Sequence, residues 1–135
     1  MDRLQAVQNA CARLVMLSKK HDHITPLLIN LHWLPVSARI KFKILLLTFK
    51  ALHGLAPIYV QDMLKNYRPS RCLRSSSQLL LSSKSYNLKS YGYCSFSVAG
   101  PFLWNSLPSS IRDISSLDNF KTALKTFLFK QTYDL

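Results

Sequence analysis

The chain has 135 residues, a formal net charge of +12 at pH 7 and a hydrophobic fraction of 48%. This length excludes a second full domain, and the apolar fraction excludes a chain that stays wholly disordered. Eighteen basic residues against six acids indicate an anionic partner, with nucleic acid first and an acidic membrane surface second.

The cysteines and the apolar runs predict an intracellular protein. Cys11, Cys72 and Cys94 are an odd number without a CxxC pair, which argues against a disulfide framework and a conventional zinc site. The N-terminus lacks the order of a secretory signal, and no apolar run approaches the ~20 residues that span a bilayer. We therefore expect reduced, buried or inert thiols, a nuclear or cytoplasmic location and no membrane partner.

Residues 1–65 are predicted to be helical. Apolar residues recur at spacings of three and four along an amphipathic helix over 4–17, namely Leu4, Val7, Cys11 and Leu14. Thr25 followed by Pro26 predicts an N-cap and a short helix to about residue 31.

The central element is predicted to be an apolar helix over 36–53, which begins after Pro35 and ends at Gly54. At ~100° per residue, Arg39, Lys43 and Lys50 fall in one narrow sector, with apolar flanks on both sides. We expect this basic stripe to stay in water. A further short helix is predicted from Pro57 to residue 65.

Residues 66–78 change character to arginine, proline and serine, which predicts an exposed basic loop. Residues 79–135 form the third part of what we expect to be one domain. Short extended segments are predicted at 79–82 and 88–91, and helices at 95–107 and from about Ser115. The fold class is therefore mainly α, a small helical domain with at most a short β-hairpin or extended segment.

A shared core is expected from the large apolar residues on these helices. Its predicted members are Trp33, Ile44, Leu47, Trp104, Leu124 and Phe127. Both tryptophans lie among leucines, which favours core anchoring over base stacking.

The residues that catalysis would need are scarce. Polymerases and metal-dependent nucleases group carboxylates around divalent cations, but the six acids are isolated aspartates. Three glycines form no phosphate-binding loop. A Cys-His site assembled from Cys72 or Cys94 with His32 or His53 stays an open alternative without a local signature. We expect no enzyme, metal, cofactor or small-molecule ligand.

The basic residues are the candidate site. Residues 36–74 hold eight basic residues against one aspartate. Arg68, Arg71 and Arg74 recur every third residue beside Tyr67, offering phosphate donors and an aromatic face for stacking. Arg39, Lys43 and Lys50 are the second group of predicted nucleic-acid contacts. A plainly solvated loop and a wet helix face are the alternative interpretations.

Five blocks in order carry a resemblance to a known family. They are LQAVQNACARLV, the stretch DHITPLLINLHWLPVSARIKFKILLLTFKALHGLAPIYVQDML, YRPSRCLRSSS, SFSVAGPFLWNSLPSSIR and the SLDNFKTALKTFLF helix. LHWLPV, KALHGLAP and LWNSLP are the landmarks within them. Together they resemble the C-terminal region of reverse transcriptases of non-LTR (LINE-type) retrotransposons, downstream of the catalytic core. One departure lies after Gly92, where Tyr93 and Cys94 stand in place of the family's charged pair.

The resemblance implies a non-catalytic piece of an RNA-directed DNA polymerase that helps to hold template or primer-template nucleic acid. The metal-binding aspartates of that family lie upstream of the matching region, so no catalytic residue is carried over. A decayed fragment without present function, and an enzyme with an unrecognised Cys or His site, stay open as alternatives. Preference for RNA or DNA is also left open.

Overall fold

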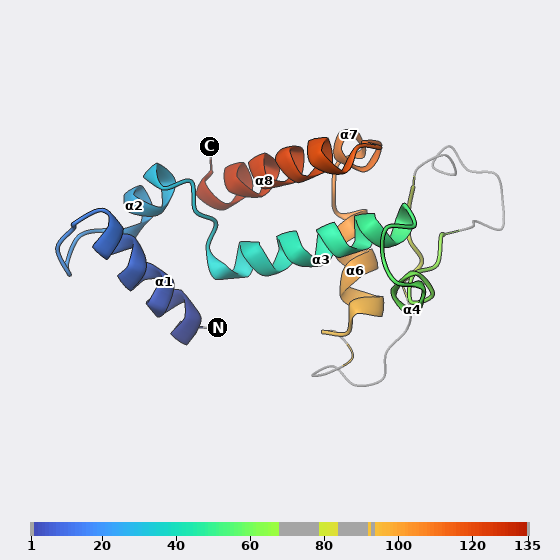
Figure 1. Ribbon diagram of the computed structural model, residues 1–135, viewed down its shortest axis with the longest axis horizontal. Coiled ribbons are helices and arrows are strands. Elements are labelled where there is room, and N and C mark those ends of the chain that lie inside the picture. Colours follow the sequence, from blue (N-terminus) through green and yellow to red (C-terminus); the bar gives the residue numbers. More distant parts are fainter. Residues whose placement is uncertain (1, 68–78, 84–91, 93, 135) are drawn as a thin grey trace. The chain divides into compact units, whose positions relative to one another are not determined.

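The computed structural model describes residues 2–67, 79–83, 92 and 94–134, and these are mainly α-helical (Figure 1). The fold class predicted from the sequence is therefore confirmed. The described helices are α1 (Asp2–Val15), α2 (Ile24–Asn30), α3 (Val36–Leu52), α4 (Ile58–Gln61), α6 (Phe96–Asn105), α7 (Ser109–Arg112) and α8 (Leu117–Tyr133).

The chain divides into two compact units. Unit 1 contains residues 1–42 and 125–135, and unit 2 contains residues 43–124. Residues of both α3 and α8 fall in each unit, because the division passes through these two long helices.

In unit 1, polar side chains of α1 bind the backbone where α3 begins. Gln5 Oε1 accepts a hydrogen bond from the Val36 N–H at 2.9 Å, and Gln8 Nε2 donates to the Leu34 carbonyl at 2.8 Å. The first N–H groups of a helix have no partner within the helix, so Gln5 acts as a cap for α3 from a distant part of the chain. The face of α1 that carries Gln5, Gln8 and Ala12 therefore turns inward.

The helix boundaries follow local signals at most, but not all, predicted positions. Gly54 adopts φ +71°, and the Leu55 N–H donates to the Lys50 carbonyl at 2.8 Å, which ends α3 as a glycine C-cap does. The predicted N-cap at Thr25 is wrong: α2 already begins at Ile24, with His23 in the N-cap position.

The core of unit 2 forms around stacked aromatic rings. Phe49 of α3 and Phe120 of α8 are both fully buried, with ring centroids 4.2 Å apart, and Trp104 of α6 lies 5.9 Å from Phe120. Gly100 lets α6 approach α3, because a Cβ at this position would lie only 3.1 Å from Thr48 Oγ1. These contacts hold α3, α6 and α8 together within unit 2.

Residues 79–83 are anchored by neighbouring side chains of α6. Trp104 Nε1 donates to the Leu79 carbonyl at 2.7 Å, and the Asn105 amide both donates to and accepts from the Leu81 backbone. Leu81 also forms an isolated antiparallel bridge with Asn66. The extended segment expected at 79–82 thus forms a single bridge in the described residues, and the segment expected at 88–91 lies outside them.

The predicted core is partly right. Trp104 and Leu124 are fully buried, whereas Trp33, Ile44 and Phe127 are half-buried and Leu47 is exposed. The prediction that Leu47 is buried is wrong. Helix α3 has two apolar flanks, and the flank that carries Leu45 and Phe49 is the buried one.

Candidate nucleic-acid interface

The predicted arginine cluster cannot be placed. Arg68, Arg71 and Arg74 lie outside the residues that the structure describes. The second predicted group is on α3 and falls in both units: Arg39 belongs to unit 1, while Lys43 and Lys50 belong to unit 2. Arg39 and Lys43 are exposed, and Lys50 is half-buried.

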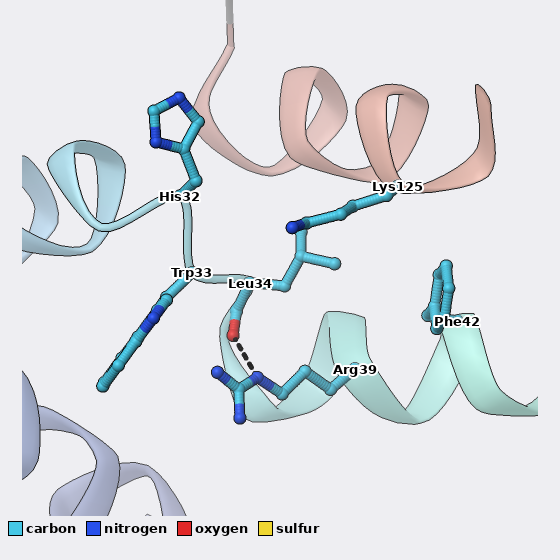
Figure 2. A pocket seen from close by; sticks show the side chains of 6 residues that line it. All are labelled: His32, Trp33, Leu34, Arg39, Phe42 and Lys125. Carbon is cyan, nitrogen blue, oxygen red and sulfur yellow. Dashed lines mark hydrogen bonds between the residues drawn. The ribbon is translucent and has the colours of Figure 1, made fainter. Parts of the chain in front are cut away.

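Arg39 lines a pocket of about 300 Å³ in unit 1 (Figure 2). The lining residues are His32, Trp33, Leu34, Arg39, Phe42 and Lys125. Figure 2 shows Arg39 reaching from α3 and Lys125 reaching from α8 toward the segment that joins α2 to α3. Two cations from separate helices, Arg39 and Lys125, thus line the same concave surface beside aromatic rings.

The Arg39 guanidinium is held in place by the Trp-Leu-Pro break. Its Nε donates to the Leu34 carbonyl at 3.0 Å, and its central carbon lies 5.7 Å from the Trp33 ring centroid. The indole face attracts the cation, and the Nε bond fixes its orientation. The two terminal nitrogens of Arg39 make no hydrogen bond within the described part of the chain, so they can donate to an outside acceptor such as a phosphate oxygen.

A second pocket, of about 390 Å³, continues the first. His32 and Lys125 line both, and Thr126, Phe129 and Lys130 of α8 complete the second. His32 stacks on Phe129 with ring centroids 5.9 Å apart, and its backbone has φ +51°. A positive φ is costly for a residue other than glycine, so the contacts around His32 must hold it there.

We refer to the two pockets together as the unit 1 groove. Its basic and aromatic lining residues are His32, Trp33, Arg39, Phe42, Lys125, Phe129 and Lys130. No acidic residue is among the described residues that line it. The groove therefore suits a ligand that combines anionic groups with flat rings, as the phosphates and bases of a nucleic-acid strand do.

Tyr133 fastens the end of α8 to this groove. Its hydroxyl donates to the Trp33 carbonyl at 2.7 Å, and its ring meets Phe129 edge to face at 4.8 Å. Burial raises the pKa of Tyr133 above its ordinary value of 10.0, and the nearby positive charge of Arg39 opposes this shift. The phenol is therefore a neutral donor at physiological pH.

Among these groove residues, only Arg39 was predicted from the sequence to contact nucleic acid. Trp33 was predicted to belong to the core, but it is half-buried and lies beside Arg39. Lys125, Lys130 and His32 were missed. Lys125 and Phe129 are four residues apart and so share a face of α8, which is the signal that could have indicated a basic and aromatic helix face.

Other kinds of site have less support in the described residues. No three His, Cys, Asp or Glu side chains among them come together in a way that could hold a metal ion. Buried or inert thiols were expected; Cys11 and Cys94 are free and exposed, so burial is wrong for these two, and Cys72 lies outside the described residues. Of the described helices, none has both the length and the apolar character to cross a bilayer.

Comparison with protein-family models found no match for this chain, and comparisons with curated proteins and with solved structures found none either.

Proposed function

We propose that the chain is a non-catalytic, basic nucleic-acid-binding segment derived from the C-terminal region of a LINE-type reverse transcriptase. The observation that carries the binding function is the unit 1 groove, where Arg39, Lys125 and Lys130 line a concave surface together with aromatic rings and no described acid. The sequence blocks that resemble the family support the origin.

The binding mode follows from the side chains in the groove. Lysine and arginine neutralise backbone phosphates regardless of sequence, and aromatic faces stack on any base. The Tyr133 hydroxyl already donates to the Trp33 carbonyl. The remaining groove residues other than His32 and Thr126 are apolar or are cations suited to phosphates. We therefore propose binding with weak sequence preference, to RNA or DNA.

We also propose that the chain has no polymerase or nuclease activity. Both reactions need carboxylates grouped around divalent cations. The six aspartates are scattered along the sequence, and no glutamate is present. The family's catalytic aspartates correspond to a region upstream of the matching blocks.

The test is salt-dependent binding of a fluorescent oligonucleotide, measured by anisotropy on a single strand and on a duplex. We expect Lys125→Gln with Lys130→Gln to lower affinity on every sequence. The slope of log affinity against log salt should flatten by about 1.8 on duplex DNA or about 1.4 on a single strand, the values for two lost phosphate contacts.

The matched control is Lys41→Gln with Lys65→Gln, which removes the same charge from two exposed positions that do not line the groove. This variant should keep most of the affinity and slope. Equal losses in both variants would show that net charge, and not the groove, binds the nucleic acid. A purified folded chain that binds no oligonucleotide would favour the decayed fragment.

A further inference from the structure

The apolar face of α1 is exposed. Its residues Leu4, Val7, Cys11 and Leu14 lie within about 80° of one another at ~100° per residue, and all four are exposed. Leu4, Val7 and Leu14 expose 63%, 61% and 75% of their surface. We call these four residues the α1 seam. A continuous apolar face left in water is typical of an interaction site.

The α1 seam is bordered by two pockets along the helix. One, of about 460 Å³, lies between Leu4, Val7 and Cys11 on one side and Trp33 and Val36 on the other. The other, of about 630 Å³, is lined by Leu14 and Leu17 at the end of α1. The surface is therefore hollowed to receive apolar side chains, unlike the convex face that an amphipathic helix lays on a lipid surface.

The spacing of the α1 seam suits a partner helix. Positions 4, 7, 11 and 14 alternate steps of three and four, which is the a and d pattern of a coiled-coil heptad. Val7 and Leu14 are seven residues apart, or ~10.5 Å along the axis. A partner helix packed along α1 can place apolar side chains one heptad apart into the two pockets.

The charges around the α1 seam select an acidic partner. Arg39 lines the first pocket, and Arg13 and Lys20 line the second. No acid is among the described residues that line either pocket. A second copy of this chain would bring another +12 against the first, which disfavours self-association.

We propose that the α1 seam docks an amphipathic helix with acidic flanks, supplied by another protein. This site adjoins the unit 1 groove, because Trp33 and Arg39 line both, whereas the four residues of the α1 seam lie outside that groove. The a and d side chains of the partner fill the two pockets, and its flanking carboxylates meet Arg13, Lys20 and Arg39.

The probe is a synthetic peptide about three heptads long, with Leu at a and d and Glu at e and g, compared with the same peptide carrying Lys at e and g. Anisotropy of the labelled peptides measures binding to the intact chain. We expect the Glu peptide to bind at least about tenfold more tightly than the Lys peptide. Equal affinity for the two would overturn the proposal.

Variants locate the site. Val7→Asn with Leu14→Asn should weaken the Glu peptide about tenfold or more, because polar groups would then face its leucines. The matched control is Leu55→Asn with Ile58→Asn, at exposed apolar residues of unit 2, which should bind as the wild type does. Similar losses in both variants would show unspecific hydrophobic binding.

Two further readouts separate the alternatives. The Glu peptide should slow alkylation of Cys11 and leave that of Cys94 unchanged, since both are exposed but only Cys11 is in the α1 seam. Concentration-dependent self-association, or binding to vesicles with anionic headgroups, that is lost in Val7→Asn with Leu14→Asn would instead assign the seam to a second copy or a lipid surface. Val7→Asn with Leu14→Asn changes no lining residue of the unit 1 groove, so this variant should still bind the oligonucleotide, and a failure of one proposal can be told from a failure of the other.

Discussion

At the level of single residues, Trp104 combines packing with a hydrogen bond. It is fully buried beside Phe120, and its indole N–H donates to the Leu79 carbonyl at 2.7 Å. Trp104→Ala should therefore lower the free energy of unfolding by about 3 to 5 kcal/mol, as measured by urea denaturation. Trp104→Phe should cost less, because it keeps most of the apolar contact. An unchanged midpoint in Trp104→Ala would place this residue outside the core.

Arg112 is a buried cation without full hydrogen bonding. Its exposed fraction is 6%, and its Nε and Nη1 have no partner in the described part of the chain. Unpaired buried donors are costly, and apolar replacements of similar size are often neutral or stabilising. Arg112→Met should raise the free energy of unfolding by about 1 to 3 kcal/mol, whereas Arg112→Lys should not. A clear loss of stability in Arg112→Met would show that the guanidinium makes a favourable contact.

The raised pKa of Tyr133 predicts that the folded protein loses stability as the pH becomes alkaline. Because burial raises its pKa above 10.0, the folded protein holds the phenolic proton more tightly than the unfolded chain does. This contribution is complete below pH 10 and is lost as the pH rises through the raised pKa. Tyr133→Phe lacks both the hydrogen bond to the Trp33 carbonyl and the titration. The stability gap between wild type and Tyr133→Phe, followed by urea denaturation from about pH 9 to about pH 11, should narrow; a constant gap would contradict this.

At the level of elements, the helices were predictable because their signals are local. Gly54 and Pro35 act through backbone conformation alone, so they mark the ends of α3 wherever it packs. The direction in which a helix faces depends on its neighbours. On α3, both apolar flanks fit the sequence pattern. Phe49 is buried because it stacks on Phe120, which itself lies beside Trp104, whereas Leu47 on the other flank is exposed.

The candidate site was predictable only in part, for the same reason. Arg39 could be identified from its place in a basic stripe on one helix. His32 and Lys125 are 93 positions apart in the numbering, so their meeting in one groove depends on tertiary packing. No periodicity within a single element contains that information.

The orientation of α1 predicts that a polar residue of this helix contributes more to the free energy of unfolding than an apolar one. Gln5 caps α3 through the Val36 N–H, whereas Val7 is exposed. Gln5→Leu should therefore cost about 1 kcal/mol, as other lost caps do, and Val7→Gln should change the free energy of unfolding by less than about 0.5 kcal/mol. Urea denaturation measures both. If Val7→Gln is the more damaging change, α1 buries its apolar face in solution.

At the level of the whole molecule, the charge is the property that every proposed nucleic-acid contact shares. Of the +12, residues 36–74 carry +7, from eight bases against one aspartate, and they include Arg39 of the unit 1 groove and the three loop arginines outside the described residues. Lys125 and Lys130 of the groove lie outside this stretch. Phosphate contacts release condensed counterions, so each one adds to the salt dependence of binding. The number of contacts can thus be counted without knowing where the loop lies.

Replacing Arg68, Arg71 and Arg74 together by alanine should weaken binding to every oligonucleotide tested. It should also flatten the slope of log affinity against log salt by roughly one unit per lost contact. Combining this triple change with Lys125→Gln and Lys130→Gln should add the two reductions in slope, provided that loop and groove hold separate phosphates of one strand. If the triple variant keeps the wild-type slope, the loop arginines are solvated surface and the groove alone binds. If the combined variant is no flatter than the groove variant, loop and groove do not act on the same strand.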